Sequence, residues 1–298
     1  MAIANAQCPE GDLDIWYETF GYADDPPLLL IMGLGAQAIA WPDEFCQGFV
    51  DRGFFVIRYD NRDVGLSSKL PGEVDIVAAA AALAENRALT AGYHLADMAN
   101  DAVAVLDALG LAKTHVLGAS MGGMIAQQLA IDHSDRVESL TSLMSTTGQR
   151  DVGQPEPELL GALLAPPASS RDEAIASGLA WLQLAGSPDH GDEDLAAELA
   201  GRQFDRGFFP SGVARQLLAI VASPERSAGL AALAVPTLVL HGTADRLIPQ
   251  SGGERTAELV PGATLELIEG MGHDLPVYFW SRIIELVTRH AANAASPY

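Results

Sequence analysis

Cysteine, lysine and long apolar runs are all scarce in this sequence. The chain of 298 residues contains two cysteines, Cys8 and Cys46, which excludes a disulfide scaffold, and their spacing matches no metal or redox motif. No uninterrupted apolar run reaches the roughly 18–20 residues that a membrane-spanning helix needs. Residues 1–12 lack both the basic region and the apolar stretch of a signal peptide. We therefore expect a soluble protein of the cytoplasm.

Positive charge is the other scarcity. Lysine and arginine total 17 against 39 aspartates and glutamates, a formal net charge of −22, and Lys69 and Lys113 are the only lysines. Such a surface repels nucleic acid and anionic membrane headgroups, so neither is expected as a partner. The simplest consequence of this charge is solubility. We expect a small-molecule partner, and a homodimer stays open.

Apolar residues make up 49% of the chain, enough for a large core. Short apolar runs that end in glycine or a polar residue predict buried parallel strands, and stretches at helical spacing lie between them. This alternation indicates an α/β fold with a mostly parallel, doubly wound sheet. The predicted strands are 28–33, 54–60, 115–118, 237–242 and 264–268, and the clearest predicted helices are 95–109 and 121–133.

The pattern changes after about residue 145. Residues 147–228 hold several prolines, many acidic residues and short helical patches at 172–184 and 192–202, with no strand-like run. A long irregular connection is the other interpretation, but it is uncommon at this length in a compact domain. We therefore predict a helical cap at 147–228, inserted between the core segments 1–146 and 229–298. Residues 71–92 form a second irregular stretch, with an alanine-rich segment at 78–84.

Ser120 is the candidate nucleophile. It lies in Gly118-Ala119-Ser120-Met121-Gly122, which follows a predicted strand and opens a predicted helix. This is the G-x-S-x-G nucleophile elbow in the context that it requires, because glycines on both sides let strand and helix backbones pass closely. The alternative is an ordinary glycine-rich turn for a phosphate, but the lysine of a P-loop is absent.

A serine nucleophile needs a base, and the base needs an acid that orients it. In this arrangement the chain order is serine, acid, histidine. Asp245 follows the strand at 237–242, and His273 follows the strand at 264–268, so both lie at the carboxyl end of the sheet with Ser120. We expect Asp245 as the acid and His273 as the base, with no metal and no cofactor. His241 is the alternative base, although we expect it to hold the loop of Asp245.

The competing acids are Asp60 and Asp63, for which a charged turn paired with Arg58 or Arg62 is the favoured interpretation.

Acyl transfer also needs donors for an oxyanion. We expect the backbone N–H groups of Leu34 and Met121 to serve. The residues expected to contact substrate are Leu34, Trp41, Met121, Trp181 and Leu247.

Most of the expected contacts are apolar, which favours a mostly neutral ester over an anionic one. A cap arginine, Arg202 or Arg206, is the alternative source of a clamp for a carboxylate. Short-chain or methyl esters of cyclic compounds are expected to react better than long-chain emulsions.

The motifs together resemble those of the α/β-hydrolase superfamily over almost the whole chain. They are M-G-L-G at 32–35, Y-D-N-R-D-V-G-L-S at 59–67, G-A-S-M-G-G at 118–123, H-G-T-A-D-R-L-I-P at 241–249 and G-M-G-H at 270–273. Within the superfamily, Met32-Gly33, W-P-D-E-F at 41–45 and D-A-V-A-V-L-D at 101–107 are similar to the aclacinomycin methylesterase group of carboxylesterases. The resemblance implies a sheet of about eight strands, a Ser120–Asp245–His273 triad, an oxyanion hole and a helical lid.

We therefore predict a cofactor-free serine hydrolase that cleaves a carboxylic ester. Fold does not fix reaction, so three rivals share the architecture. They are a carbon–carbon bond hydrolase of ring-cleavage diketones, an acyltransferase, and a ligand-binding receptor with a weak triad. Turnover of simple aryl esters separates an enzyme from a receptor.

Overall fold

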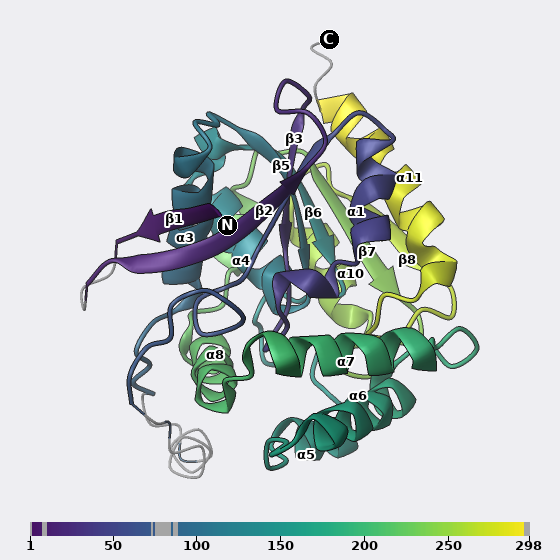
Figure 1. Cartoon of the computed structure of the whole chain (residues 1–298). Coiled ribbons are helices and arrows are strands. Elements are labelled where there is room, and N and C mark those ends of the chain that lie inside the picture. The colour runs from purple at the N-terminus through teal and green to yellow at the C-terminus, as the bar shows by residue number, and fades with distance from the viewer. Residues whose placement is uncertain (1, 8–10, 73, 75–84, 86–88, 295–298) are drawn as a thin grey trace.

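The computed structural model describes the chain except residues 1, 8–10, 73, 75–84, 86–88 and 295–298. Eight strands form one sheet in the order β1-β2-β4-β3-β5-β6-β7-β8 (Figure 1). β1 and β2 are antiparallel to their neighbours, and the others run parallel, which confirms the predicted mostly parallel sheet. The strands are β1 (Ala2–Ala6), β2 (Leu13–Phe20), β3 (Pro27–Ile31), β4 (Phe55–Tyr59), β5 (Thr114–Ala119), β6 (Val137–Leu143), β7 (Thr237–Gly242) and β8 (Thr264–Ile268).

Helices cover both faces of the sheet. α3 and α4 pack on one face with α9 and α10, and α1 and α11 pack on the other (Figure 1). Within the described residues, no helix is both long and apolar enough to cross a membrane. The helices are α1 (Asp43–Val50), α3 (Leu95–Ala108), α4 (Met121–Asp132), α5 (Pro157–Leu163), α6 (Arg171–Ala185), α7 (Glu193–Gly207), α8 (Pro210–Ala222), α9 (Ser227–Ala231), α10 (Ser251–Leu259) and α11 (Val277–Ala294), with short 3-10 turns η1 (Ala38–Ala40) and η2 (Ser134–Arg136).

The core lies on both sides of the sheet because side chains alternate along each strand. In β3, Leu29 and Ile31 join the cluster under α3 and α4, whereas Leu28 and Leu30 join the cluster under α1 and α11. All four side chains are fully buried. A strand covered on both faces is apolar throughout, which is why the sequence reveals β3 so clearly.

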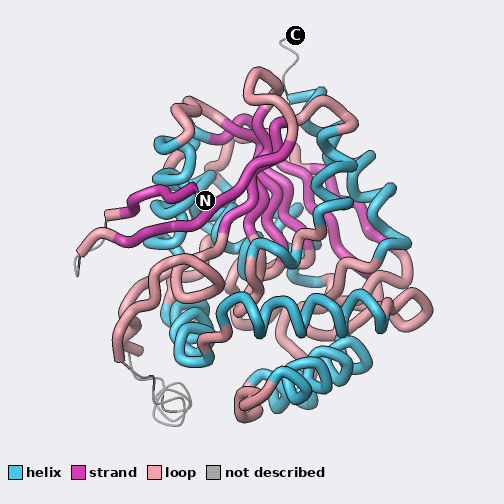
Figure 2. Tube along the Cα trace, viewed as in Figure 1, coloured by secondary structure: helices cyan, strands magenta, loops and turns pink. Residues whose placement is uncertain are grey.

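The chain between β6 and β7 carries α5 to α9 and no strand. Figures 1 and 2 show α5 to α8 gathered below the carboxyl ends of the parallel strands. α6 and α7 pack against each other. We call 147–228 the helical insert; its role as a cap stays a prediction. The alanine-rich segment at 78–84 lies outside the described residues.

Candidate active site

Ser120 stands at a strained turn between β5 and α4. Its backbone has φ 57° and ψ −121°, a region that non-glycine residues seldom adopt. The strands and helix approach so closely that a Cβ on Gly118 would lie 2.1 Å from the Gly122 carbonyl oxygen. A Cβ on Gly122 would lie 2.0 Å from the Ile31 carbonyl oxygen. Only glycine therefore fits at positions 118 and 122. The turn between them holds the Ser120 side chain at the carboxyl end of the sheet.

The structure brings Ser120, His273 and Asp245 into one hydrogen-bonded chain. His273 Nε2 lies 2.9 Å from Ser120 Oγ, and His273 Nδ1 lies 2.7 Å from Asp245 Oδ2. The other oxygen of Asp245 accepts the N–H groups of Leu247 at 3.0 Å and Ile248 at 2.9 Å. Asp245 is 5% exposed, so its carboxylate is held in one orientation.

The protonation pattern follows from these contacts. A carboxylate only accepts hydrogen bonds, so His273 Nδ1 must carry a proton toward Asp245. Neutral His273 then presents an unprotonated Nε2 to Ser120, which is the form that can accept the serine proton. The backbone N–H of His273 donates to Ala185 O at 2.6 Å, so the end of α6 also positions this loop.

His241 is fully buried beneath this group. Its Nε2 lies 2.7 Å from the Ile248 carbonyl oxygen and 3.6 Å from Asp245 Oδ2. Burial lowers the pKa of His241, which favours a neutral ring that donates to Ile248. His241 thus supports the loop of Asp245, and it makes no hydrogen bond to Ser120.

The loop after β3 carries the expected oxyanion donor Leu34. Asn61 Nδ2 donates to the Met32 carbonyl oxygen at 2.9 Å, and the Gly35 N–H donates to Gln216 Oε1 of α8 at 2.8 Å. Neither the Leu34 nor the Met121 N–H donates to another described residue. The loop is therefore held on both sides of Leu34, and the Leu34 N–H remains available to donate to an oxyanion.

Gly33, in the loop after β3, packs against the Ser120 side chain. A Cβ at this position would lie 3.1 Å from Ser120 Cβ and 3.5 Å from Ser120 Oγ. We expect Gly33→Ala to lower kcat for an aryl ester by up to about 100-fold, because a misplacement of a reacting group by about 1 Å can cost this much. Steady-state kinetics and a thermal melt measure activity and stability together.

Gly92→Ala is the matched control for Gly33→Ala, because a Cβ there meets no atom within 4 Å. Equal kcat values for the two variants would contradict the crowding of Ser120 by residue 33.

A cavity of about 1690 Å³ lies over Ser120 and His273, between the sheet end and the insert. Four of the five predicted substrate contacts line it: Leu34, Trp41, Trp181 and Leu247. Met121 does not, because its fully buried side chain packs in the core under α3 and α4. The expectation that this side chain borders the substrate is therefore wrong. Within the described residues, no group of three His, Cys, Asp or Glu side chains is placed to hold a metal.

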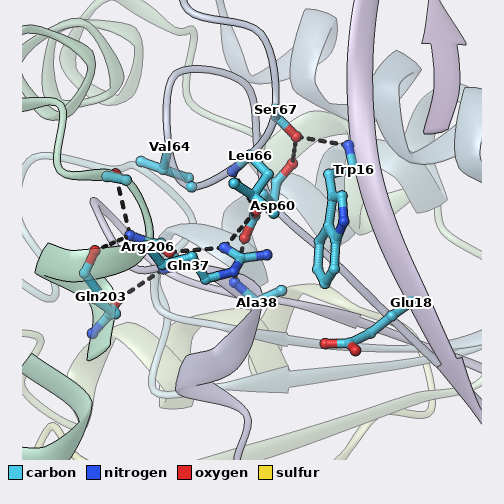
Figure 3. Close-up of polar contacts among 12 residues, drawn as sticks. Trp16, Glu18, Gln37, Ala38, Asp60, Val64, Leu66, Ser67, Gln203 and Arg206 are labelled. Carbon is cyan, nitrogen blue, oxygen red and sulfur yellow. Dashed lines mark hydrogen bonds and ion pairs between the residues drawn. The ribbon is translucent and has the colours of Figure 1, made fainter. Parts of the chain in front are cut away.

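The interpretation of Asp60 and Asp63 needs a correction. Asp60 pairs at 2.7 Å with Arg206 of α7, not with Arg58 or Arg62 (Figure 3). Asp60 is fully buried and also accepts the N–H groups of Ala38 and Leu66, each at 2.7 Å. The ion pair therefore fastens the insert to the core.

Arg206 makes two further contacts at this position. Its Nη1 also donates to Gln37 Oε1 at 2.7 Å, and its guanidinium lies 4.3 Å from the Trp16 ring centre (Figure 3). Arg202 pairs with Glu198 at the surface. Neither arginine lines the cavity, so neither is the carboxylate clamp that the sequence left open.

Asp63 forms a second ion pair between the core and the helical insert. Arg215 of α8 donates to both of its oxygens, with Nε and Nη2 each at 2.9 Å. Tyr93 Oη and the Leu70 N–H each add a hydrogen bond of 2.8 Å. A bidentate arginine–carboxylate pair is among the stronger charge-assisted contacts.

We expect Arg215→Met to lower the free energy of unfolding by about 3–5 kcal/mol, because it leaves the buried Asp63 carboxylate without its cation. Asp63→Asn in the same chain should recover part of this loss, since asparagine is uncharged and tolerates the φ of 73° at residue 63. Urea unfolding at constant slope measures both changes. An Arg215→Met midpoint equal to that of the exposed control Arg282→Gln would contradict the prediction.

Comparison with known proteins identifies the family. A model described as alpha/beta hydrolase fold matches residues 26–278. The chain belongs to the alpha/beta hydrolase fold family. This alpha/beta hydrolase is 31% identical to rhodomycin D methylesterase DauP of Streptomyces sp. (strain C5), with 95% of this chain and 96% of that protein covered. It is 30% identical to rhodomycin D methylesterase DnrP of Streptomyces peucetius, with the same coverage of 95% and 96%.

The predicted resemblance to a methylesterase group is thereby confirmed. Among solved structures, a meta-cleavage product hydrolase of Pseudomonas fluorescens IP01, CumD, superimposes with a TM-score of 0.74 at 21% identity. The match covers 99% of this chain and 98% of that one. At this identity the likeness supports the fold.

Proposed function

We propose that this alpha/beta hydrolase is a serine ester hydrolase that forms an acyl-enzyme on Ser120, with His273 as base and Asp245 as orienting acid. The observation that carries the proposal is the continuous hydrogen-bonded chain from Asp245 through His273 to Ser120 at the wall of a large cavity. The relatives DauP and DnrP, whose names describe methylesterases, support an ester as the substrate.

The reaction follows from the contacts. Ser120 Oγ attacks the ester carbonyl carbon while His273 Nε2 takes its proton, and the N–H groups of Leu34 and Met121 bind the resulting oxyanion. The tetrahedral intermediate collapses as the bond to the alkoxy oxygen breaks and His273 returns the proton to the departing alcohol. Water then gives a proton to His273 and attacks the acyl carbon. The bond from this carbon to Ser120 Oγ breaks as His273 returns the proton to Oγ, which releases the carboxylic acid and restores the enzyme.

The cavity favours a bulky small molecule. Its volume of about 1690 Å³ exceeds the roughly 300–1000 Å³ of ordinary ligand sites. Trp41 and Trp181 supply apolar surface from the core and from the insert, which acts as the cap over the substrate. We therefore favour a methyl or short-chain ester of a cyclic compound. The cytoplasmic location and a homodimer stay predictions.

A covalent probe and a size series test the proposal. A fluorophosphonate should add to Ser120 alone, as read by peptide mapping. The methyl ester of a two- or three-ring aromatic acid should have a higher kcat/KM than methyl benzoate, because each buried Å² of apolar surface contributes about 25 cal/mol. Labelling of another serine, or the absence of any ester turnover, would overturn the assignment.

A further inference from the structure

Arg226 is a buried cation in the wall of the cavity. It precedes α9 and is 5% exposed. Its Nε donates to Gln127 Oε1 at 3.0 Å, and its Nη2 donates to the Thr146 carbonyl oxygen at 2.7 Å. Both acceptors are neutral, and Nη1 has no hydrogen-bond partner among the described residues. Burial without a paired carboxylate lowers the pKa of Arg226 to about 10, so the side chain remains charged at neutral pH.

The neighbouring Glu225 carboxylate offsets only part of the effect of burial on the pKa of Arg226. Glu225 accepts the Ser227 N–H at 2.9 Å and thereby faces the start of α9. In the part of the chain that the structure describes, Arg226 forms no ion pair. A buried guanidinium that meets only neutral acceptors is costly unless an anion reaches it from the cavity.

A second polar group without a partner belongs to a residue whose backbone contacts Arg226. Thr146 Oγ1 is buried, has no hydrogen-bond partner among the described residues, and belongs to a residue that also lines the cavity. Thr146 and Arg226 are in direct contact, since the Thr146 carbonyl oxygen accepts Arg226 Nη2. Two glycines of the cavity wall lie next to these groups: a Cβ on Gly148 would lie 3.5 Å from Arg226 Nη1, and a Cβ on Gly153 would lie 2.9 Å from Thr146 Oγ1.

These groups line the same cavity as Ser120 and His273. Ser145, which precedes Thr146, donates its hydroxyl to the Ser120 carbonyl oxygen at 2.8 Å. The other charged residues of the cavity wall are Arg150 and the carboxylates of Asp151, Asp192, Glu225 and Asp274. Asp274 follows His273 in the chain and accepts the Ser187 hydroxyl at 2.5 Å.

We propose that Arg226 and Thr146 form a subsite for a carboxylate that the ester substrate carries away from its scissile bond. The inference rests on the proposed esterase function and narrows its substrate class. It revises the expectation that a mostly neutral ester is favoured over an anionic one: the molecule is mostly neutral and carries one anionic group. The Nη1 N–H groups of Arg226 and the Thr146 hydroxyl donate to the carboxylate oxygens.

Two pairs of chromogenic esters test the subsite. The first pair is p-nitrophenyl hemisuccinate and p-nitrophenyl butyrate, which differ by a carboxylate on the acyl side. The second is 3-carboxy-4-nitrophenyl acetate and 4-nitrophenyl acetate, which differ by a carboxylate on the alcohol side. We expect the wild-type enzyme to favour the anionic member of at least one pair, and that pair tells which half of the substrate enters the subsite.

Thr146→Val is the decisive variant, because it preserves shape and removes a hydroxyl that no described protein group uses. It should lower kcat/KM for the preferred anionic ester about tenfold, mainly through KM, and leave the neutral partner within about twofold. Arg226→Gln should lower kcat/KM for the anionic ester further, and a thermal melt establishes that this variant is folded. Arg282→Gln on the outside of α11 is the matched loss of charge, and it should leave both rates unchanged.

The outcomes separate the two proposals. Hydrolysis of neutral esters without preference for either anionic member, or equal effects of Thr146→Val on both members of a pair, would overturn the subsite and leave the esterase intact. Failure to hydrolyse any of the four esters would instead overturn the proposed function.

Discussion

Ser120→Ala is expected to lower kcat for p-nitrophenyl acetate by about four to six orders of magnitude, because it removes the only atom that can form the acyl-enzyme. The residual rate comes from binding and from the oxyanion donors. Stability should change little, since Ser120 Oγ hydrogen-bonds only to His273 among the described residues and alanine tolerates the strained turn no worse than serine. Steady-state kinetics and a thermal melt provide the two readouts.

Ser169→Ala is the control for this substitution, since that serine is exposed at the start of α6 and bonds only to Glu173 among the described residues. It should retain full activity and full phosphonate labelling. Substantial turnover by a folded Ser120→Ala enzyme would show that another group is the nucleophile.

Asp245→Asn is the second large effect, with an expected loss of about 10⁴ in kcat. The N–H groups of Leu247 and Ile248 select the amide oxygen for their side of the asparagine. The amide nitrogen then faces His273 Nδ1 and donates to it. His273 must accept at Nδ1 and carry its proton on Nε2, the tautomer that cannot take the proton of Ser120.

The geometry makes this prediction separable from unfolding. The introduced asparagine keeps the volume of the aspartate and both loop hydrogen bonds, so the thermal midpoint should move little while the rate falls. Asp205→Asn on α7 removes an exposed carboxylate of the same kind and should leave kcat unchanged. A kcat for Asp245→Asn within tenfold of wild type would contradict the role of Asp245.

The candidate site can be predicted from the sequence because its three residues occupy local positions with a fixed meaning. Ser120, Asp245 and His273 each follow an apolar run by a few residues. Parallel strands deliver such positions to one edge of the sheet, so three distant segments meet without any knowledge of side-chain packing. The paired glycines around Ser120 indicate the closest backbone approach as well.

β6 shows where the pattern is insufficient. Its residues Val137–Leu143 include Ser139 and Ser142, both buried, and no apolar run marks it as a central strand. Ser139 Oγ lies 2.9 Å from His115 Nδ1, and Gln127 Nε2 donates to Ser142 Oγ at 3.1 Å. A search for apolar runs misses such a strand, because its buried serines are hydrogen-bonded to residues that are distant in the sequence.

Charge pairing is the other limit. Asp60 and Asp63 lie beside Arg58 and Arg62 in the sequence, yet their cations come from Arg206 and Arg215, more than 140 positions away. Arg58 instead pairs with Glu18 and Asp43, and Arg62 with Asp101. β4 ends at Tyr59 and the chain turns over residues 62–67, with a φ of 73° at Asp63, so proximity in sequence does not select an ion-pair partner.

The sequence by itself determined the sheet class, the order of nucleophile, acid and base, and the edge at which they meet. These follow from local hydrophobic runs, glycines and chain direction. Only the tertiary structure decided how the insert is fastened, which side chains face the cavity, and that Arg226 and Thr146 retain unused donors there. Burial and hydrogen-bond satisfaction are properties of the whole packed molecule, since each depends on groups that the chain brings together only when it folds.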